Sequence, residues 1–564
     1  MDIAATRSTR STRSADVRHS TLFTFLFAVI IVTVVIPLCF VFFDGLFKIE
    51  NHRLTVTLQY FEQVMGNRRY WVALTNTAVV ALGATVVAVL LGVALAWLLV
   101  RTNTPGAALV ENLAVIPIFI PPFVGAFAWI LLAAPRIGIF NLISRMLGFG
   151  EPVDIYTHLG MAFVIGIYLA PYVLMIVASA LRSMDPSLEE AGQVSGMSVA
   201  RTAMTITLPV VAPAIFSSAI LTFVITIGLF GTPVLLGWSK QILLITSRIY
   251  LEWQDVPPAY GVIAVLSIYL VIFSGAAMLL QHWLLKGRSF VTVTGKGYRP
   301  RILQLGNARF LACGAAWTYL TLAVFAPLAV VVAAAMFTYT WSGNFTWANI
   351  LFLWTSNDVA ETLKNSLLIT VLAATTTTTF GIFVAWVTCR TTLRGRHLLE
   401  FLVLLPASVP GIAFGIGVAF FWLRVPIGIY GTIWIIVLAY LGRYASYAVG
   451  TISSSLVQVH PELEESARIC GYGWLKTLSQ ITLPLVRPSI VSSWVLLYSI
   501  FITELSMVTI LHTTETRTFS ILTFNTWYNG RFANVASLSL LQLLLGVAVM
   551  FVVRASAKRL GPGE

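Results

Sequence analysis

Two polar stretches of this sequence share one pattern: EEAGQVSGMSVARTAMTITLP spans residues 189–209, and EESARICGYGWLKTLSQITLP spans residues 464–484. Eight of the 21 aligned positions are identical, including both leading glutamates, one glycine and the closing Ile-Thr-Leu-Pro. Acidic residues in the first turn and a central glycine predict a short amphipathic helix, a turn and a second short helix. The duplication indicates a chain built from two similar halves.

The rest of the chain is strongly apolar. Of its 564 residues, 58% are hydrophobic and only 10% are charged, whereas soluble domains carry about 25% charged residues. This composition predicts a membrane protein, and we attribute the net charge of +13 to membrane topology and not to nucleic-acid binding. The four cysteines form no disulfide or metal-ligand pattern: Cys39, Cys313, Cys389 and Cys470.

The apolar runs predict an all-α transmembrane protein of about twelve transmembrane helices, because a helix needs about 20 apolar residues to cross a bilayer. The first run is longer than a signal-peptide core of roughly 7–15 residues, so we interpret it as a retained span. The expected spans of the first half are residues 21–43, 71–100, 113–134, 159–181, 210–237 and 259–285. Those of the second half are residues 310–338, 362–389, 399–423, 431–453, 485–511 and 536–556.

The apolar spans repeat together with the polar stretches. Residues 76–101 parallel residues 365–390, and the two prolines near the third span, Pro117 and Pro121, recur in the same register as Pro406 and Pro410 near the ninth. The two polar stretches lie somewhat closer together along the chain than these pairs do, and a longer loop at 135–158 in the first half accounts for the difference. Each half therefore contributes six spans, and two tandem six-helix halves share one orientation in the membrane.

Lysine and arginine residues set that orientation. Segment 286–309 carries six basic residues and no acid, so we expect it in the cytoplasm, and the even number of spans then places both termini there. The predicted organisation is a disordered basic arm (1–20), a first half (21–285) with a polar loop (182–209), a basic linker (286–309), a second half (310–556) with a polar loop (454–484), and a cytoplasmic tail (557–564).

At the two polar stretches the chain resembles the permease subunits of ATP-binding-cassette (ABC) importers. The signature loop of that family reads Glu-Ala-Ala, three residues, Gly, nine residues, Ile, one residue, Leu-Pro. Both copies keep this spacing, and each changes one small residue. The matching residues of the first copy are Glu190, Ala191, Gly192, Gly196, Ile206, Leu208 and Pro209. Those of the second are Glu465, Ser466, Ala467, Gly471, Ile481, Leu483 and Pro484.

The resemblance implies a MetI-like, type I importer fold in which each signature loop is a coupling helix that docks on a cytoplasmic ATPase. Two loops imply an ATPase homodimer, and the family also implies a periplasmic substrate-binding protein. No G-x-x-x-x-G-K-[ST] loop occurs, so we expect ATP and magnesium on the partner subunit and no enzymatic activity, cofactor or metal site in this chain. The alternative is that the loops resemble each other only because the halves arose by duplication.

Over nearly its whole length the chain is similar to fused two-half permeases of ferric-iron importers in the bacterial inner membrane. Segments 228–237, 290–301 and 501–511 carry this resemblance, which implies ferric iron as cargo. Permeases for 2-aminoethylphosphonate, polyamines and thiamine share these segments, so those cargoes stay open. An ion-coupled secondary transporter is the alternative from another class, although the spans contain few of the ionisable residues that it would need.

Glu504 is the acidic residue that this pattern places in the middle of a span. A charge at that depth costs roughly 2.5–3.5 kcal/mol on insertion scales and marks a candidate translocation path. The alternative is a structural role, in which Glu504 pairs with Arg443, with Lys364 or with a backbone group. The aligned first-half residue is Leu229, so a path lined by Glu504 would be chemically asymmetric.

Overall fold

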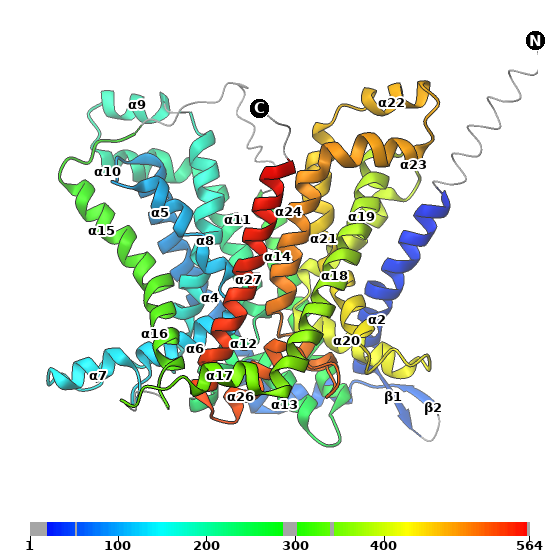
Figure 1. The fold of residues 1–564 in the computed structure, drawn as a ribbon, viewed down its shortest axis with the longest axis horizontal. Helices are drawn as coiled ribbons and strands as arrows, with labels where there is room; N and C mark the ends of the chain where they lie inside the picture. The colour runs from blue at the N-terminus through cyan, green and yellow to red at the C-terminus, as the bar shows by residue number, and fades with distance from the viewer. Residues whose placement is uncertain (1–19, 51–52, 186, 286–301, 339–342, 561–564) are drawn as a thin grey trace, which may run out of the picture.

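The computed structural model describes residues 20–50, 53–185, 187–285, 302–338 and 343–560, and every structural statement below refers to these residues. The described chain is almost entirely helical (Figure 1). Its two named strands form one antiparallel hairpin, β1 (Phe47–Glu50) with β2 (Arg53–Val56). The predicted basic arm and most of the basic linker lie outside the described residues.

The described residues contain nine helices that are long and apolar enough to cross a membrane. Two further helix pairs pass the same test together but are bent sharply at a break, and residues 532–546 form a shorter apolar stretch within α27 (Phe532–Leu560). These elements account for the twelve predicted spans. The nine are Ser20–Leu46, Arg68–Arg101, His158–Ser183, Ala203–Gly228, Tyr260–Gln281, Ala308–Ala335, Asn357–Arg390, Ile433–Gln458 and Trp474–Thr503.

The predicted internal repeat is confirmed by the helix boundaries. Helices α4 (Arg68–Arg101) and α18 (Asn357–Arg390) are both 34 residues long and begin and end at equivalent positions of the repeat. Lengths and bounds also correspond for α8 (His158–Ser183) with α21 (Ile433–Gln458) and for α11 (Leu208–Gly228) with α24 (Leu483–Thr503). Even the π-helical turns recur, as η1 (Ile31–Val35) with η5 (Thr321–Phe325) and η3 (Ala203–Thr207) with η7 (Leu478–Thr482).

Each half is built around one tight helix pair, α4 with α8 and α18 with α21. A Cβ at Gly92 of α4 would lie 2.5 Å from the Cβ of Val173, and a Cβ at the equivalent Gly381 of α18 would lie 2.5 Å from the Cβ of Ala448. Only glycine permits such an approach between helix backbones, which is how membrane helices gain packing where the hydrophobic effect contributes little.

The first span of each half packs on the other half (Figure 1). Helix α2 (Ile36–Leu46) lies against α20 (Gly411–Arg424), where Arg424 donates two hydrogen bonds to Asp44. In return, α15 (Ala308–Leu320) and α16 (Ala326–Ala335) lie against the first half, where the Tyr319 hydroxyl donates to the carbonyl of Ile167 at 3.2 Å. The exchange interlocks the two halves.

Four of the predicted spans are broken. The third bends by 103° between Ala107–Phe119 and α6 (Pro122–Ala133), and the ninth bends by 114° between Arg396–Ser408 and α20. The predicted continuous spans 210–237 and 485–511 are wrong at their ends: α11 stops at Gly228 and α24 stops at Thr503. Short helices follow each break, α12 (Gly231–Gly237) and α25 (Val508–Leu511).

The remaining short helices cover one end of the molecule, which we call the distal face (Figure 1). They include α7 (Ile139–Met146), α13 (Ile245–Gln254), α17 (Ala348–Thr355) and α26 (Phe519–Tyr528). The opposite end carries the two duplicated polar stretches. The repeat therefore places both signature loops on the same side of the molecule.

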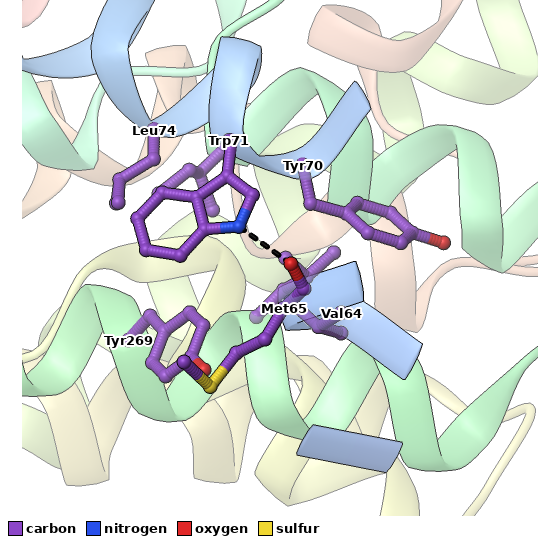
Figure 2. Close-up of a pocket in the computed structure, with 8 residues that line it drawn as sticks. Val64, Met65, Tyr70, Trp71, Leu74 and Tyr269 are labelled. Carbon is purple, nitrogen blue, oxygen red and sulfur yellow. Dashed lines mark hydrogen bonds between the residues drawn. The ribbon is translucent and has the colours of Figure 1, made fainter. Parts of the chain in front are cut away.

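A small cavity lies where α3 (Gln59–Gly66) turns into α4 and packs on α14 (Tyr260–Leu285) (Figure 2). The indole N–H of Trp71 donates to the carbonyl of Met65 at 2.7 Å across this corner, with Tyr269 below it. The volume of the cavity, about 20 Å³, is close to the minimum that one water molecule needs. This cavity is a packing feature and cannot hold a cargo.

Candidate functional site

Both polar stretches fold as the sequence predicts, as a short helix, a turn and a second short helix. The first is α9 (Ser187–Val194) with α10 (Val199–Thr202), and the second is α22 (Glu462–Ile469) with α23 (Trp474–Thr477) (Figure 1). The turns contain Gly196 at φ +82° and Gly471 at φ +84°. This left-handed conformation is strained for residues with a side chain, which explains glycine at both positions.

The fourteen signature residues fall into an exposed set and a packed set. The exposed residues are Glu190, Ala191, Gly196, Pro209, Glu465, Ser466, Gly471 and Pro484. The buried or half-buried residues are Gly192, Ile206, Leu208, Ala467, Ile481 and Leu483. A Cβ at Gly192 would lie 2.7 Å from Cδ1 of Ile206, so a small residue there lets the first helix pack on the segment that leads into α11.

In the second half, a buried acidic residue that the sequence did not single out fixes the helix pair. Glu464, directly before Glu465, accepts hydrogen bonds from Nε of Arg390 at 3.1 Å and from the hydroxyl of Thr482 at 2.9 Å. Arg390 also donates through Nη2 to the carbonyls of Leu456 at 2.9 Å and Val459 at 2.6 Å. This network joins α22 to the ends of α18 and α21 and to the start of the next span.

The first half repeats the same residues with looser geometry. Glu189 accepts from the hydroxyl of Thr207 at 2.7 Å and lies 3.7 Å from Nε of Arg101. Both charged side chains are buried, at 0% and 1% exposure, yet the guanidinium of Arg101 makes no hydrogen bond with the described residues. Arg101 and Arg390 end the equivalent helices α4 and α18, so both halves place an arginine beside the buried glutamate but with different numbers of bonds, and in the second half Arg468 also lies 3.8 Å from Glu464.

The sequence contained a signal for this network. Both glutamates of each stretch are identical between the copies, as are Thr207 and Thr482, and an arginine closes each of the two aligned spans. Sequence reasoning assigned a role only to the second glutamate of each pair. The first of each pair is the buried one, because it lies on the face of the short helix that packs on the membrane spans.

Each short helix also presents one strongly exposed apolar side chain. Val194 is 89% exposed and the equivalent Ile469 is 86% exposed, and the exposed signature glutamates Glu190 and Glu465 precede them by four residues, a spacing that places both on one helix face. Single exposed apolar residues are common on protein surfaces, but their recurrence at the equivalent position of both copies makes Val194 and Ile469 candidates for a contact with another protein.

Glu504 does not lie in the middle of a span, contrary to the sequence-based expectation. It is the residue that directly follows the last turn of α24, and its carboxylate accepts hydrogen bonds from the backbone N–H of Met507 at 2.9 Å and of Val508 at 3.1 Å. These bonds satisfy amide groups that the break between α24 and α25 would leave unpaired in an apolar environment. Lys364, an alternative partner, is exposed on α18 and forms no ion pair with Glu504.

Arg443 binds backbone carbonyls at the other break of the second half, the bend in the ninth span. From the middle of α21 it donates to the carbonyls of Pro406, at 3.4 Å, and of Val409, which precede the sharp bend before α20. Gly411 separates the two charges: a Cβ there would lie 3.6 Å from Oε1 of Glu504 and 3.7 Å from Cζ of Arg443. In the first half the equivalent positions hold Tyr168 and Leu229, so these charges have no counterpart there.

Aromatic side chains close the distal end between the two halves. The ring of Phe524 on α26 lies 6.1 Å from Phe123, 5.8 Å from Phe230 and 5.7 Å from Tyr250, all three from the first half. The described residues contain no group of three or more His, Cys, Asp or Glu side chains that could hold a metal ion. A cargo that passes between the halves would have to displace these rings.

Comparison with known proteins agrees with this architecture. Residues 88–289 and 377–562 match the family described as binding-protein-dependent transport system inner membrane component. The chain is 28% identical over 457 residues to the putative ferric transport system permease protein FbpB 1 of Haemophilus influenzae, which covers 79% of this chain and 71% of the relative. It is 26% identical over 475 residues to the ferric transport system permease protein FbpB of Actinobacillus pleuropneumoniae, covering 83% and 68%.

A shorter match is to a permease named for a different cargo. The putative 2-aminoethylphosphonate transport system permease protein PhnV of Salmonella typhi is 24% identical over 169 residues, which cover 30% of this chain and 64% of that protein. The two matched family regions, by contrast, together span more than half of the chain, one in each half. The chain therefore belongs to the inner membrane components of binding-protein-dependent transport systems and is a multi-pass permease of an ABC importer.

Proposed function

We propose that this protein is the permease of a ferric-iron importer, with the two helix pairs as the docking elements for a homodimeric ATPase that hydrolyses Mg-ATP. The observation that carries the coupling role is the equivalence of the two pairs: the same helix boundaries, left-handed glycines and buried glutamates occur twice on one side of the molecule. A symmetric dimer needs two such docking sites.

The exposed signature residues supply the contact surface. Glu190 and Glu465 lie beside the apolar side chains of Val194 and Ile469, so each loop offers a hydrophobic tip with a charged rim. Interfaces between proteins commonly have this composition. Beneath this surface the Glu464 and Glu189 networks tie each loop to membrane spans, so that a push on the loop would reach α18 and α4.

The orientation follows from the same assignment. We assign the side that bears the signature loops, together with both termini, to the cytoplasm, and the distal face to the periplasm, where a substrate-binding protein would deliver the cargo. The concentration of basic residues in segment 286–309 supports this orientation.

Ferric iron is the cargo that the relatives favour, because the two long matches are named as ferric transport permeases. A second candidate is 2-aminoethylphosphonate. The PhnV match supports it, as does the proximity of Arg443 and Glu504, since a zwitterion carries one charge for each. Glu504 lies where the halves meet: its neighbour Leu505 comes within 3.1 Å of a Cβ placed on Gly231 of the first half.

Uptake of labelled ferric iron into iron-limited cells tests the proposal. Cells that lack the gene should lose uptake, and the wild-type gene should restore it. The double variant Gly196→Pro/Gly471→Pro should not, because proline cannot adopt the positive φ of either turn. Gly148→Pro is the matched control, since Gly148 also has a positive φ, +83°, in open space but lies after α7 on the distal face.

Membrane-fraction immunoblots would show that all variants insert. Transport by the double variant at the wild-type rate would refute the coupling role. Unchanged iron uptake in the deletion strain, combined with lost uptake of 2-aminoethylphosphonate, would transfer the assignment to the second candidate and leave the coupling role intact.

A further inference from the structure

A polar cavity of about 470 Å³ opens on the distal face beside α26. It is far larger than the packing cavity of Figure 2 and falls in the range of about 300–1,000 Å³ that is usual for ligand sites. We call it the distal basin. Its lining residues come from the loop that follows α25, from α26 and from the residue that caps α26: His512, Thr513, Thr514, Arg517, Asn525, Tyr528 and Asn529.

The distal basin is rich in hydrogen-bond donors and lined by no carboxylate. Arg517 is half-buried, and among the described residues its guanidinium has no hydrogen bond and no ion pair. The side-chain amides of Asn525 on α26 and of Asn529, which caps that helix, add further donors to the lining. A guanidinium that lines a polar cavity and has no partner among the described residues keeps its five N–H donors available, and it therefore favours an anionic ligand.

His512 contributes an uncharged group to this lining. Its Nδ1 lies 2.9 Å from the carbonyl of Val508, so Nδ1 carries the proton and Nε2 keeps its lone pair. Burial lowers the pKa of His512, the hydrogen bond to Val508 opposes that shift, and the nearby Arg517 charge adds to it. His512 is therefore neutral at neutral pH, and Arg517 provides the formal charge of the lining.

The position of the distal basin connects it to the cargo route. On α26, Phe524 and Trp527 contact Phe123 of the first half, with ring centroids 6.1 Å and 6.4 Å away, whereas Asn525 and Asn529 line the basin. Tyr528 belongs to the basin and also packs edge-on against Trp238 of the first half at 5.6 Å. One short helix thus carries both the basin and the aromatic contact that closes the distal end between the halves.

We propose that the distal basin binds an oxyanion group of the cargo, such as a phosphate, phosphonate or carboxylate. Arg517 would bind two oxygens side by side, as guanidinium groups do with carboxylate and phosphate, and the asparagine amides would donate to the others. The proposal rests on the proposed importer function and deepens it. Since Arg517 repels a bare cation, ferric iron would enter the basin only with an anionic ligand attached.

Titration calorimetry on the purified full-length protein tests the proposal. The probes are inorganic phosphate, 2-aminoethylphosphonate, citrate and ferric citrate. Wild-type protein should bind at least one of them, and Arg517→Gln should weaken that affinity about tenfold or more, the loss expected when a hydrogen-bonded charge is removed. Arg517→Lys should retain part of the affinity, because it keeps the charge but loses the two-pronged geometry.

The matched control is Arg531→Gln, an exposed arginine that follows α26 and does not line the distal basin. It should bind every probe as the wild type does, and unchanged melting temperatures would show that the variants are folded. Equal binding of citrate and ferric citrate would identify the anion itself as the ligand. Binding of ferric citrate alone would identify an anion that arrives with the metal, and both results support the proposal.

No binding of any probe to the wild type, or equal affinities of wild type and Arg517→Gln, would overturn the proposal. The binding assay requires no transport, so its outcome is independent of the uptake test. Lost iron uptake in the deletion strain with normal binding in Arg517→Gln would refute the oxyanion site alone. Normal iron uptake with weakened binding in Arg517→Gln would refute the ferric assignment alone.

Discussion

Replacing the arginine that ends α18 should damage its polar loop far more than the equivalent change in α4. Arg390→Met removes three direct hydrogen bonds, to Glu464 and to the carbonyls of Leu456 and Val459, whereas Arg101→Met removes none. Both changes also remove the charge that faces a buried glutamate. The arginines occupy equivalent helix ends, and the sites differ further only in Arg468, an exposed second cation that lies 3.8 Å from Glu464.

The difference between the two variants can be estimated from those bonds. A hydrogen bond to a charged group contributes about 1.5–3 kcal/mol, so three such bonds imply an extra cost on the order of 5 kcal/mol at Arg390. A tenfold change in an equilibrium constant corresponds to about 1.4 kcal/mol. Since relaxation and water entry reduce such costs, we expect a local opening constant that rises at least about a hundredfold more for residues 462–482 than for residues 187–207.

Amide hydrogen exchange measured by mass spectrometry on the purified protein would report this directly, because it resolves the opening of single segments. Both variants should lose protection, but the loss in α22 and α23 for Arg390→Met should exceed the loss in α9 and α10 for Arg101→Met by at least about a hundredfold. Arg390→Lys, which keeps the positive charge, should fall between wild type and Arg390→Met. Equal losses of protection in the two loops would refute the reasoning, because the observed bond pattern would then have no energetic consequence.

Three further predictions concern other parts of the chain. The double variant Val194→Glu/Ile469→Glu should leave membrane insertion and the melting temperature unchanged, because both residues are exposed, but it should abolish co-purification of the ATPase. Co-purification of the ATPase with this variant would contradict the proposed docking surface. Glu504→Ala should lower the melting temperature more than Glu504→Gln, which still offers one acceptor to the freed amides, and equal shifts would argue against the capping role. Gly381→Val should destabilise the protein by about 1–3 kcal/mol or more through overpacking, while Gly275→Val, where a Cβ would meet nothing within 4 Å, should melt as the wild type does.

The sequence predicted the architecture well because the signals involved are local or repeated. Apolar runs of about 20 residues are sufficient to predict membrane spans. The parallel between residues 76–101 and 365–390, together with the duplicated polar stretches, predicted the two halves whose helix boundaries the structure reproduces. The helix-turn-helix form of the polar loops was also predictable, since glycine at Gly196 and Gly471 indicates a left-handed turn.

The breaks in the spans were less predictable. Proline pairs marked the third and ninth spans, whereas the weaker signals in 210–237 and 485–511, Gly231 and Pro233 in the first and Glu504 in the second, were outweighed by the apolar run, so the helix ends at Gly228 and Thr503 were missed. A hydropathy pattern measures the hydrophobicity of a segment, and a broken span is as hydrophobic as a continuous one. Glu504 was consequently placed within a helix, although its carboxylate pairs with the amides that follow the helix end.

The sequence by itself determined that this protein is a duplicated, mostly helical membrane protein, because composition, period and spacing are properties of the chain alone, and the resemblance of its two polar stretches to a known signature indicated a permease. Only the tertiary structure decided which glutamate of each signature pair is buried and which is exposed, how many bonds hold each polar loop, and that Arg517 faces a cavity without a partner. The physical reason is distance along the chain. Arg390 and Glu464 are 74 residues apart, and the free energy of a buried charge depends on neighbours that only the packed fold brings within hydrogen-bonding distance.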